Sequence, residues 1–154
     1  MAIRRIRKDG DEILRKISKN VDAIDDKVHR LLDDMADTMY KYDGVGLAAV
    51  QVGILRRIVI IDVNDNKGLI ELINPVITEY EGEQIKTEGC LSCPGVFGDV
   101  KRPEKVTVKA LNRKGEEILI KGKGLLAVAL CHELEHLEGK LFKDTADNIT
   151  KEGV

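Results

Sequence analysis

The run HELEH, residues 132–136, contains the residue types of a catalytic metal site. Positions four apart on a helix lie about 40° from each other around its axis, so His132 and His136 can point at one ion. Glu133 lies about 100° from His132, outside the direct ligand direction but within reach of a water on the ion. The spacing therefore predicts a divalent metal with Glu133 as the acid/base residue. A chance match remains the alternative, with both histidines simply hydrogen-bonded on a helix.

A catalytic site of this kind needs a third protein ligand and one open position. Phe142 stands where the extended metzincin motif requires a histidine, so that family in its usual form is excluded. Glu138 and Glu152 are the only glutamates among the 18 residues that follow His136, which leaves little room for a ligand from a later helix. Upstream, the run EGCLSCPG offers Cys90, whose thiolate is a strong ligand for zinc or ferrous iron. Cys90 would complete a His/His/Cys set.

Cys90 also forms a CxxC pair with Cys93, and this pair allows two other interpretations. One is a closed structural zinc site made of two cysteines and two histidines, and the other is a redox dithiol. The structural site leaves Glu133 unexplained, and its cysteine-to-histidine interval far exceeds that of a zinc finger. With Cys131 the chain has three cysteines, and an odd number in a non-secreted chain favours thiols or metal ligands over disulfides.

Two helices and several strands must position these residues. From Ile24 to Gly44 the apolar residues recur at helical spacing, which predicts an amphipathic helix packed on one face. LLAVALCHELEHLE, between Gly124 and Gly139, is apolar nearly all round in its first half and predicts a buried central helix. The runs predicted as strands are residues 58–63, residues 69–77, broken by Pro75, and a hairpin of residues 105–111 and 116–122 around NRKG.

The pattern predicts one domain, residues 1–154, of the α+β class: mostly antiparallel strands around a buried central helix carrying HExxH, with an N-terminal amphipathic helix. The net charge of -2 and the pI near 6.0 argue against wholesale binding of nucleic acids or membranes. No run of residues has the length of a signal peptide core or a membrane span. We therefore expect a cytoplasmic protein.

Three separated blocks of sequence together resemble the three motifs of the peptide deformylase family. They are GVGLAAVQ at residues 44–51, EGCLS at residues 88–92 and HELEH at residues 132–136. They occur in the family's order and span nearly the whole chain. The family removes the N-formyl group from the initiator methionine of new bacterial polypeptides. The resemblance therefore implies a metal-dependent hydrolase in protein biosynthesis, with ferrous iron as the expected metal and zinc as a possible one.

By this resemblance, Cys90, His132 and His136 hold the metal and Glu133 is the catalytic carboxylate. Gln51 and the backbone N–H of Leu91 stabilise the oxyanion, and such pairs of donors aimed at one point are the parts of an oxyanion hole. The expected mechanism is that the metal lowers the pKa of its water, Glu133 accepts the proton, and the hydroxide attacks the formyl carbon. Glu133 then returns the proton to the departing amine, and formate is released.

The formylmethionyl peptide is the expected partner. Gly44, Val45 and Gly46 resemble the family's substrate wall, where exposed backbone pairs with the peptide as an added strand, although the glycines could equally end a helix. Val128 and Ala129 lie one turn before His132 and are expected to line the pocket for the methionine side chain, or to be ordinary core residues.

The chain departs from the family pattern at three positions. Glu135 replaces the usual aspartate of HExDH and is expected to orient neighbouring groups such as Arg102. Cys93 and Cys131 replace an apolar residue and a glutamine, and we interpret both as small buried hydrophobes.

Binding partners other than the peptide are less evident. The typical basic C-terminal docking helix is absent after LFKD, so docking to the ribosome by that route is not expected. Arg4, Arg5, Arg7 and Lys8 are interpreted as solvated surface charge rather than an RNA contact. No membrane and no sequence-specific nucleic acid are expected as partners.

Overall fold

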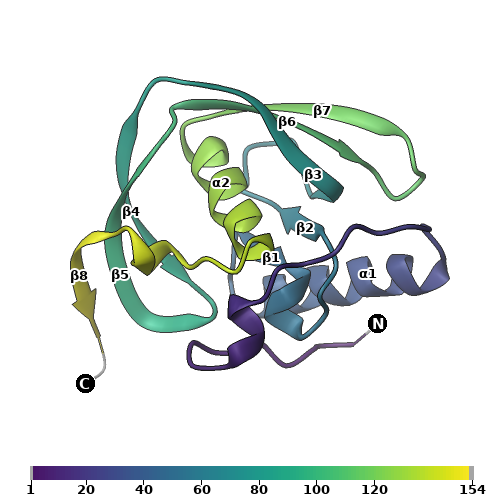
Figure 1. Cartoon of the computed structure of the whole chain (residues 1–154), viewed down its shortest axis with the longest axis horizontal. Helices are drawn as coiled ribbons and strands as arrows, with labels where there is room; N and C mark the ends of the chain where they lie inside the picture. The colour runs from purple at the N-terminus through teal and green to yellow at the C-terminus, as the bar shows by residue number, and fades with distance from the viewer. Residues whose placement is uncertain (1, 153–154) are drawn as a thin grey trace.

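The computed structural model of the protein describes residues 2–152. Helix α2 (Leu125–Leu137) lies between two antiparallel sheets, and helix α1 (Asp26–Lys41) packs on the outside of the molecule (Figure 1). The predicted α+β class with mostly antiparallel strands is therefore confirmed. Within the described residues, neither helix combines the length and the apolar character needed to cross a bilayer.

The strands form a five-stranded sheet and a three-stranded sheet, in the spatial orders β1-β2-β3-β6-β7 and β4-β5-β8. The larger sheet consists of β1 (Gly46–Ala48), β2 (Ile58–Ile61), β3 (Ile70–Glu81), β6 (Lys105–Leu111) and β7 (Glu117–Lys123). The smaller sheet consists of β4 (Gln84–Cys90), β5 (Cys93–Arg102) and β8 (Asp147–Lys151). Short 3-10 helices cover Glu12–Arg15, Ala49–Val52 and Phe142–Asp144. Because β1 is the outermost strand of its sheet, its other edge pairs with no strand among the described residues.

Helix α2 is buried because its side chains are apolar around almost the whole circumference. Every residue from Leu126 to Leu134 is buried, including the polar residues His132 and Glu133. Gly122 of β7 permits this packing, since a Cβ there would lie 2.8 Å from Cδ1 of Leu130. The buried residues of the metal motif, His132, Glu133 and His136, are thus fixed on a helix with little freedom to shift.

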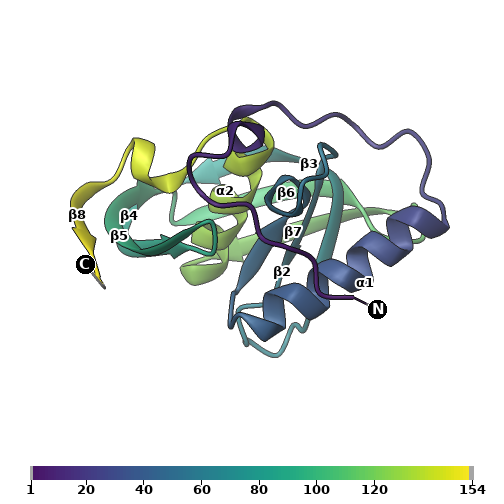
Figure 2. The same cartoon turned by 90° about the horizontal axis from the view of Figure 1, so that it is seen from below.

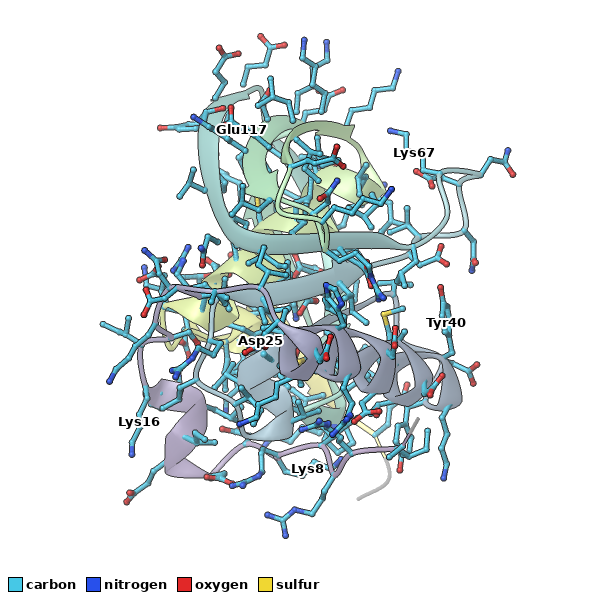
Figure 3. The ribbon with its side chains drawn as sticks, turned by 90° about the vertical axis from the view of Figure 1, so that its right-hand side faces the viewer. Lys8, Lys16, Asp25, Tyr40, Lys67 and Glu117 are labelled. Atoms are coloured by element: carbon cyan, nitrogen blue, oxygen red, sulfur yellow. The ribbon has the colours of Figure 1, made fainter. Side chains whose placement is uncertain are left out.

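Helix α1 is apolar on one face and polar on the other. Asp25 caps its N-terminus by accepting a hydrogen bond from the backbone N–H of Val28 at 3.1 Å. Leu32, Met35 and Met39 on its inner face are fully buried. They belong to one apolar cluster with residues of β1 and β2. Figure 3 shows the helix lying across one side of the molecule, from Asp25 at its start to Tyr40 near its end.

Strand β3 differs from the prediction, because Pro75 does not break it. The strand runs on to Glu81, and its pairing with β6 shifts register between Ile73 and Val76. Asn74 adopts a left-handed conformation there, with φ 54°. A bulge of this kind accommodates the missing N–H of a proline without ending the strand.

The N-terminal segment (residues 2–11) runs across one face of the molecule (Figure 2). Its hydrogen bonds join parts that are distant in sequence. The backbone N–H of Arg7 donates to the carbonyl of Gln51 at 2.7 Å, and that of Asp9 donates to the carbonyl of Ser92 at 2.8 Å. At the other end of the segment, Arg4 forms an ion pair of 2.9 Å with the buried carboxylate of Asp34. The segment therefore connects α1 to the residues around the predicted oxyanion hole.

Candidate metal centre

Cys90, His132 and His136 converge in the structure. Cys90 ends β4, and the histidines lie on successive turns of α2. Nε2 of His136 is 3.4 Å from Sγ of Cys90 and 3.3 Å from Nε2 of His132. Within residues 2–152 this is the one group of three or more His, Cys, Asp or Glu side chains whose ligand atoms all lie within 4.8 Å of one another. Cys93 is outside the group, which argues against a closed site with two cysteines and two histidines.

The spacing of these atoms suits a tetrahedral ion. Two imidazole nitrogens bound at 2.0–2.1 Å to such an ion would be about 3.3 Å apart, and a nitrogen and a thiolate sulfur would be about 3.5 Å apart. The separations of 3.3 Å and 3.4 Å agree with these values. Three protein ligands leave one position of a tetrahedron open, as in catalytic rather than structural sites.

His132 is held by a buried chain of charged side chains. Its Nδ1 is 2.9 Å from Oε1 of Glu88, which leaves Nε2 directed toward the other two ligands. Arg102 donates two hydrogen bonds to the same carboxylate, at 2.8 and 2.9 Å. Burial opposes ionisation of Glu88, but Arg102 and His132 outweigh it and lower the pKa of Glu88. The carboxylate therefore stays charged beside the imidazole and fixes its orientation.

His136 is the most deeply buried member of the set. Burial, assisted by repulsion from His132, holds the pKa of His136 well below its usual value. The ring is therefore neutral, which is the form that binds metal ions. Phe142, at the position where a metzincin would carry a third histidine, instead stacks on His132 with ring centroids 5.9 Å apart. Its aromatic ring thus excludes water from one side of the ligand set.

Glu133 is buried beside the ligands. Its Oε2 is 3.9 Å from Nε2 of His132, and burial raises the pKa of Glu133 to about 7. Its other oxygen, Oε1, has no hydrogen-bond partner among residues 2–152. A carboxyl group with a raised pKa and a free oxygen is suited to accept and return a proton near neutral pH. The backbone of Gly46 on β1 lies directly against this carboxylate.

Gln51 has a fixed amide orientation. The backbone N–H of Ala48 donates to Oε1 of Gln51 at 2.9 Å, so the Nε2 group faces the other way. Nε2 donates to Oγ of Ser92 at 3.0 Å and lies 3.5 Å from Sγ of Cys90. The donor predicted for the oxyanion hole therefore lies at the edge of the ligand set. Leu91 occupies the turn between β4 and β5 and lines a cleft that opens over the ligand set.

A cleft of about 460 Å³ opens over these residues. Its lining includes all of the predicted substrate and pocket residues, which are Gly44, Val45, Gly46, Val128 and Ala129. Gln51 and His136 are not among the residues that line it. A second hollow, of about 410 Å³, lies on strands β3, β6 and β7 near Lys67 (labelled in Figure 3) and contains none of the predicted site residues.

The cleft also includes residues that the sequence reasoning missed, among them Lys86, Phe97 and Leu125. The period of two along a strand could have indicated Lys86, because it lies two residues before Glu88 on β4. Phe97 has no such local signal, since it comes from the neighbouring strand. It lies over Gly89, where a Cβ would be 2.9 Å from its ring.

The three residues that depart from the family pattern are Glu135, Cys93 and Cys131. Glu135 accepts a hydrogen bond of 2.6 Å from Arg102, so it contacts the predicted partner. Cys93 and Cys131 are both buried, at 3% and 6% exposure. Contact with Cys93, together with burial, raises the pKa of the Cys90 thiol.

Known proteins of one family are similar to this chain over nearly its whole length. A family model described as polypeptide deformylase matches residues 3–152. A peptide deformylase of Acetivibrio thermocellus is 67% identical over 144 residues, which cover 94% of this chain and 84% of the relative. A peptide deformylase of Carboxydothermus hydrogenoformans is 54% identical over 153 residues, which cover 99% of each chain.

Solved structures give the same result. The crystal structure of a peptide deformylase from Legionella pneumophila superposes with a TM-score of 0.91 at 49% sequence identity, covering 95% of this chain and 87% of the other. The crystal structure of peptide deformylase from Thermotoga maritima also reaches a TM-score of 0.91, at 40% identity, with 94% and 98% covered.

Proposed function

The chain belongs to the polypeptide deformylase family and is an enzyme of that kind, and we propose that it removes the N-formyl group from the formylmethionine at the start of newly made polypeptides. One observation carries the proposal. The amide nitrogen of Gln51 lies 3.5 Å from the sulfur that completes the Cys/His/His set, and the carboxylate of Glu133 lies beside the same set. The metal-ligand set, a proton acceptor and a hydrogen-bond donor for the oxyanion therefore surround one point at the base of a cleft large enough for a peptide.

Cys90, His132 and His136 would hold one divalent ion, either ferrous iron or zinc. Such an ion supplies positive charge that polarises a carbonyl oxygen and acidifies water. The thiolate donates more charge than an imidazole and suits both metals. The Glu88–His132 pair keeps one imidazole aligned, and this kind of support raises the basicity of a ligand.

Glu133 performs the proton transfers of the reaction. Its carboxylate accepts a proton as water attacks the formyl carbon, and it delivers that proton to the departing amine nitrogen. Its burial on α2 and its pKa of about 7 allow both steps without a large energetic penalty in either protonation state. The products are formate and a free N-terminal methionine.

Gln51 and Leu91 stabilise the negative charge that develops on the formyl oxygen. The Nε2 group of Gln51 is already oriented by Ala48 and Ser92, so little reorganisation is needed during the reaction. The backbone N–H of Leu91 is the second donor. Loss of a single donor of this type typically removes about 2.7–4 kcal/mol of transition-state stabilisation.

The peptide is bound along the edge of β1. Gly44, Val45 and Gly46 offer backbone groups there, and β1 is the outermost strand of its sheet. An extended peptide can pair with this edge as an additional strand. The methionine side chain enters the cleft beside Val128 and Ala129, whose small apolar side chains suit an unbranched thioether.

Formate release from formyl-Met peptides tests the proposal, with the same peptides lacking the formyl group as a control. We expect Glu133→Gln to lower the rate at least about 100-fold, because general acid–base catalysis typically contributes that much or more. Glu138→Gln is the matched control, since Glu138 lies at the end of the same helix and pairs on the surface with Arg57. Equal activity of the Glu133→Gln variant and the unaltered protein would contradict the mechanism.

Two further measurements separate this proposal from its rivals. Cleavage of internal peptide bonds would identify a general metallopeptidase. X-ray absorption of the anaerobically purified protein should show one sulfur and two nitrogen ligands. Two sulfur ligands would indicate the structural zinc site and would overturn the catalytic assignment.

A further inference from the structure

Cys90 and Cys93 face each other across the hairpin of β4 and β5. They are register partners, Cα opposite Cα, on either side of the turn formed by Leu91 and Ser92. Opposed residues of antiparallel strands have Cα atoms about 4.5–5.5 Å apart, and disulfides span Cα separations of about 4.4–6.8 Å. The backbone therefore brings the two residues within bonding range without rearrangement.

The side chains of Cys90 and Cys93 also contact the same apolar cluster. Cys90 packs against the apolar cluster to which Cys93 belongs, together with Leu141 and Phe142. An apolar surrounding tolerates a disulfide well, because the bond carries no charge and needs no hydrogen bond.

Cys90 and Cys93 differ in how easily a small reagent can reach their thiols. Cys90 lines the cleft and is only half-buried, whereas Cys93 is 3% exposed behind it. A small reagent entering the cleft therefore meets Cys90 first, and Cys93 is placed to resolve the product. Cys131 lies in a different apolar cluster, on the side of α2 that packs against the larger sheet.

We propose that Cys90 and Cys93 are a site of reversible disulfide formation, and that this disulfide competes with the metal for the Cys90 sulfur. The competition rests on the proposed metal site, whereas formation of the disulfide does not. A thiolate bound to an ion has its nucleophilic electron pair engaged, and a sulfur in a disulfide is a poor ligand. Metal binding and oxidation are thus mutually exclusive states of one sulfur atom.

The oxidant is a small disulfide such as oxidised glutathione. The Cys90 thiolate attacks one glutathione sulfur, forms a mixed disulfide and releases one glutathione thiolate. The Cys93 thiolate then attacks the Cys90 sulfur, forms the Cys90–Cys93 bond and releases the second glutathione. The two protein thiols lose two electrons to glutathione and two protons to the solvent.

The test uses reduced, metal-free protein treated with oxidised glutathione, then alkylated and analysed by intact mass and peptide mapping. We expect the unaltered protein to lose two of its three thiols, to join Cys90 to Cys93 and to retain no glutathione. Cys93→Ala should stop at the mixed disulfide on Cys90. Cys131→Ala, an equally conservative change of another buried cysteine, should form the bond as the unaltered protein does.

Metal-loaded protein in the same assay tests the competition. We expect the bond to form at least about tenfold more slowly when Zn²⁺ is bound, and the oxidised protein to bind Co²⁺ only after reduction by dithiothreitol. Persistent glutathione on Cys90 of the unaltered protein, or a bond that includes Cys131, would refute the disulfide site. Equal oxidation rates with and without metal would refute the competition. None of these measurements depends on formate release, so they fail independently of the deformylase proposal.

Discussion

Gly46 and Glu133 are so close that a side chain at residue 46 would collide with the carboxylate: a Cβ there would lie 2.5 Å from Oε2 of Glu133. Gly46 cannot withdraw, because it is buried and paired with Ile61 of β2. Gly46→Ala should therefore turn the carboxylate out of position and lower the rate of formate release about 100-fold, as a misplacement of about 1 Å can do. Steady-state kinetics measure the effect.

A double-mutant cycle checks that the collision is the cause. Gly46→Ala should also lower the melting temperature of the unaltered protein, because the contact strains the interior. In a Glu133→Ala background the same substitution should cost much less stability, since the space is then free. Equal losses in both backgrounds would show that residue 46 acts through something other than Glu133.

Ser92 is predicted to position Gln51. Ser92→Ala removes the acceptor for Nε2 of Gln51 and should lower kcat about tenfold, because a buried hydrogen bond is worth about 1–3 kcal/mol when one partner is lost. Ser18→Ala is the matched control, since Oγ of this buried serine has no hydrogen-bond partner within residues 2–152. A decrease in kcat of the same size in both variants would contradict a specific role of Ser92.

Glu135 is predicted to support the metal ligands through Arg102. Glu135→Gln weakens the contact of 2.6 Å and should loosen the Arg102–Glu88–His132 chain. We expect the affinity for Zn²⁺, measured by competition with a chelator, to fall about tenfold. This is the lower end of the loss in metal affinity that follows when a contact supporting a metal ligand is removed. Glu138→Gln, whose ion pair with Arg57 is exposed, should leave the affinity unchanged.

Metal binding should stabilise the fold through His136. Adding Zn²⁺ to the metal-free protein at about 100 times its dissociation constant should contribute about 2.7 kcal/mol to the free energy of unfolding. His136→Ala should abolish this increase, measured by thermal denaturation. His29→Ala provides the control, because His29 lies on α1 and contacts the backbone of Arg113 instead. An undiminished increase in the His136→Ala variant would exclude His136 as a ligand.

The stability contributed by the contacts between Asp34 and the N-terminal segment should depend on pH. Burial opposes ionisation of Asp34, but hydrogen bonds from the Ala2 backbone and Arg4 outweigh it and lower the pKa of Asp34 below 3.8. Stability from this group is present above pH 3.8 and is lost as the pH falls through the lowered value. The difference in melting temperature between the unaltered protein and Asp34→Asn should therefore shrink below pH 3.8.

The matched variant for this measurement is Asp37→Asn, one turn further along α1. Asp37 has no ion pair among the described residues, so we expect its substitution to change stability little. If the difference between the unaltered protein and Asp34→Asn were constant through the acid range, Asp34 would not be the group responsible.

Much of the site could be predicted because its signals are local. The periodicity of α2 and the spacing of His132 and His136 lie within one helix, and the hairpin of β6 and β7 follows from its turn. Cys90 follows from the ligand chemistry of EGCLSCPG together with the need for a third ligand, whereas Gln51 follows only from the resemblance of three separated blocks. In these cases the chemistry of each residue was visible from its type.

The remaining contacts depend on how distant segments pack against each other. The sequence alone does not show this packing. Glu88 could be seen as part of EGCLS, but its hydrogen bond to His132 depends on the position of β4 relative to α2. Ser92 had no signal that it would hold Gln51. Pro75 predicts a break in the strand, but a bulge with Asn74 in a left-handed conformation lets β3 continue.

The N-terminal segment has a consequence for the order in which the molecule assembles. The amides of Arg7 and Asp9 need carbonyl groups from Gln51 and Ser92, which leave the ribosome much later than the segment itself. Residues 2–11 are therefore made before their hydrogen-bond partners and can dock only after those partners have been made. Because the segment bonds to Gln51 and to the serine that orients the Gln51 amide, docking of residues 2–11 is a step in assembling the proposed oxyanion hole.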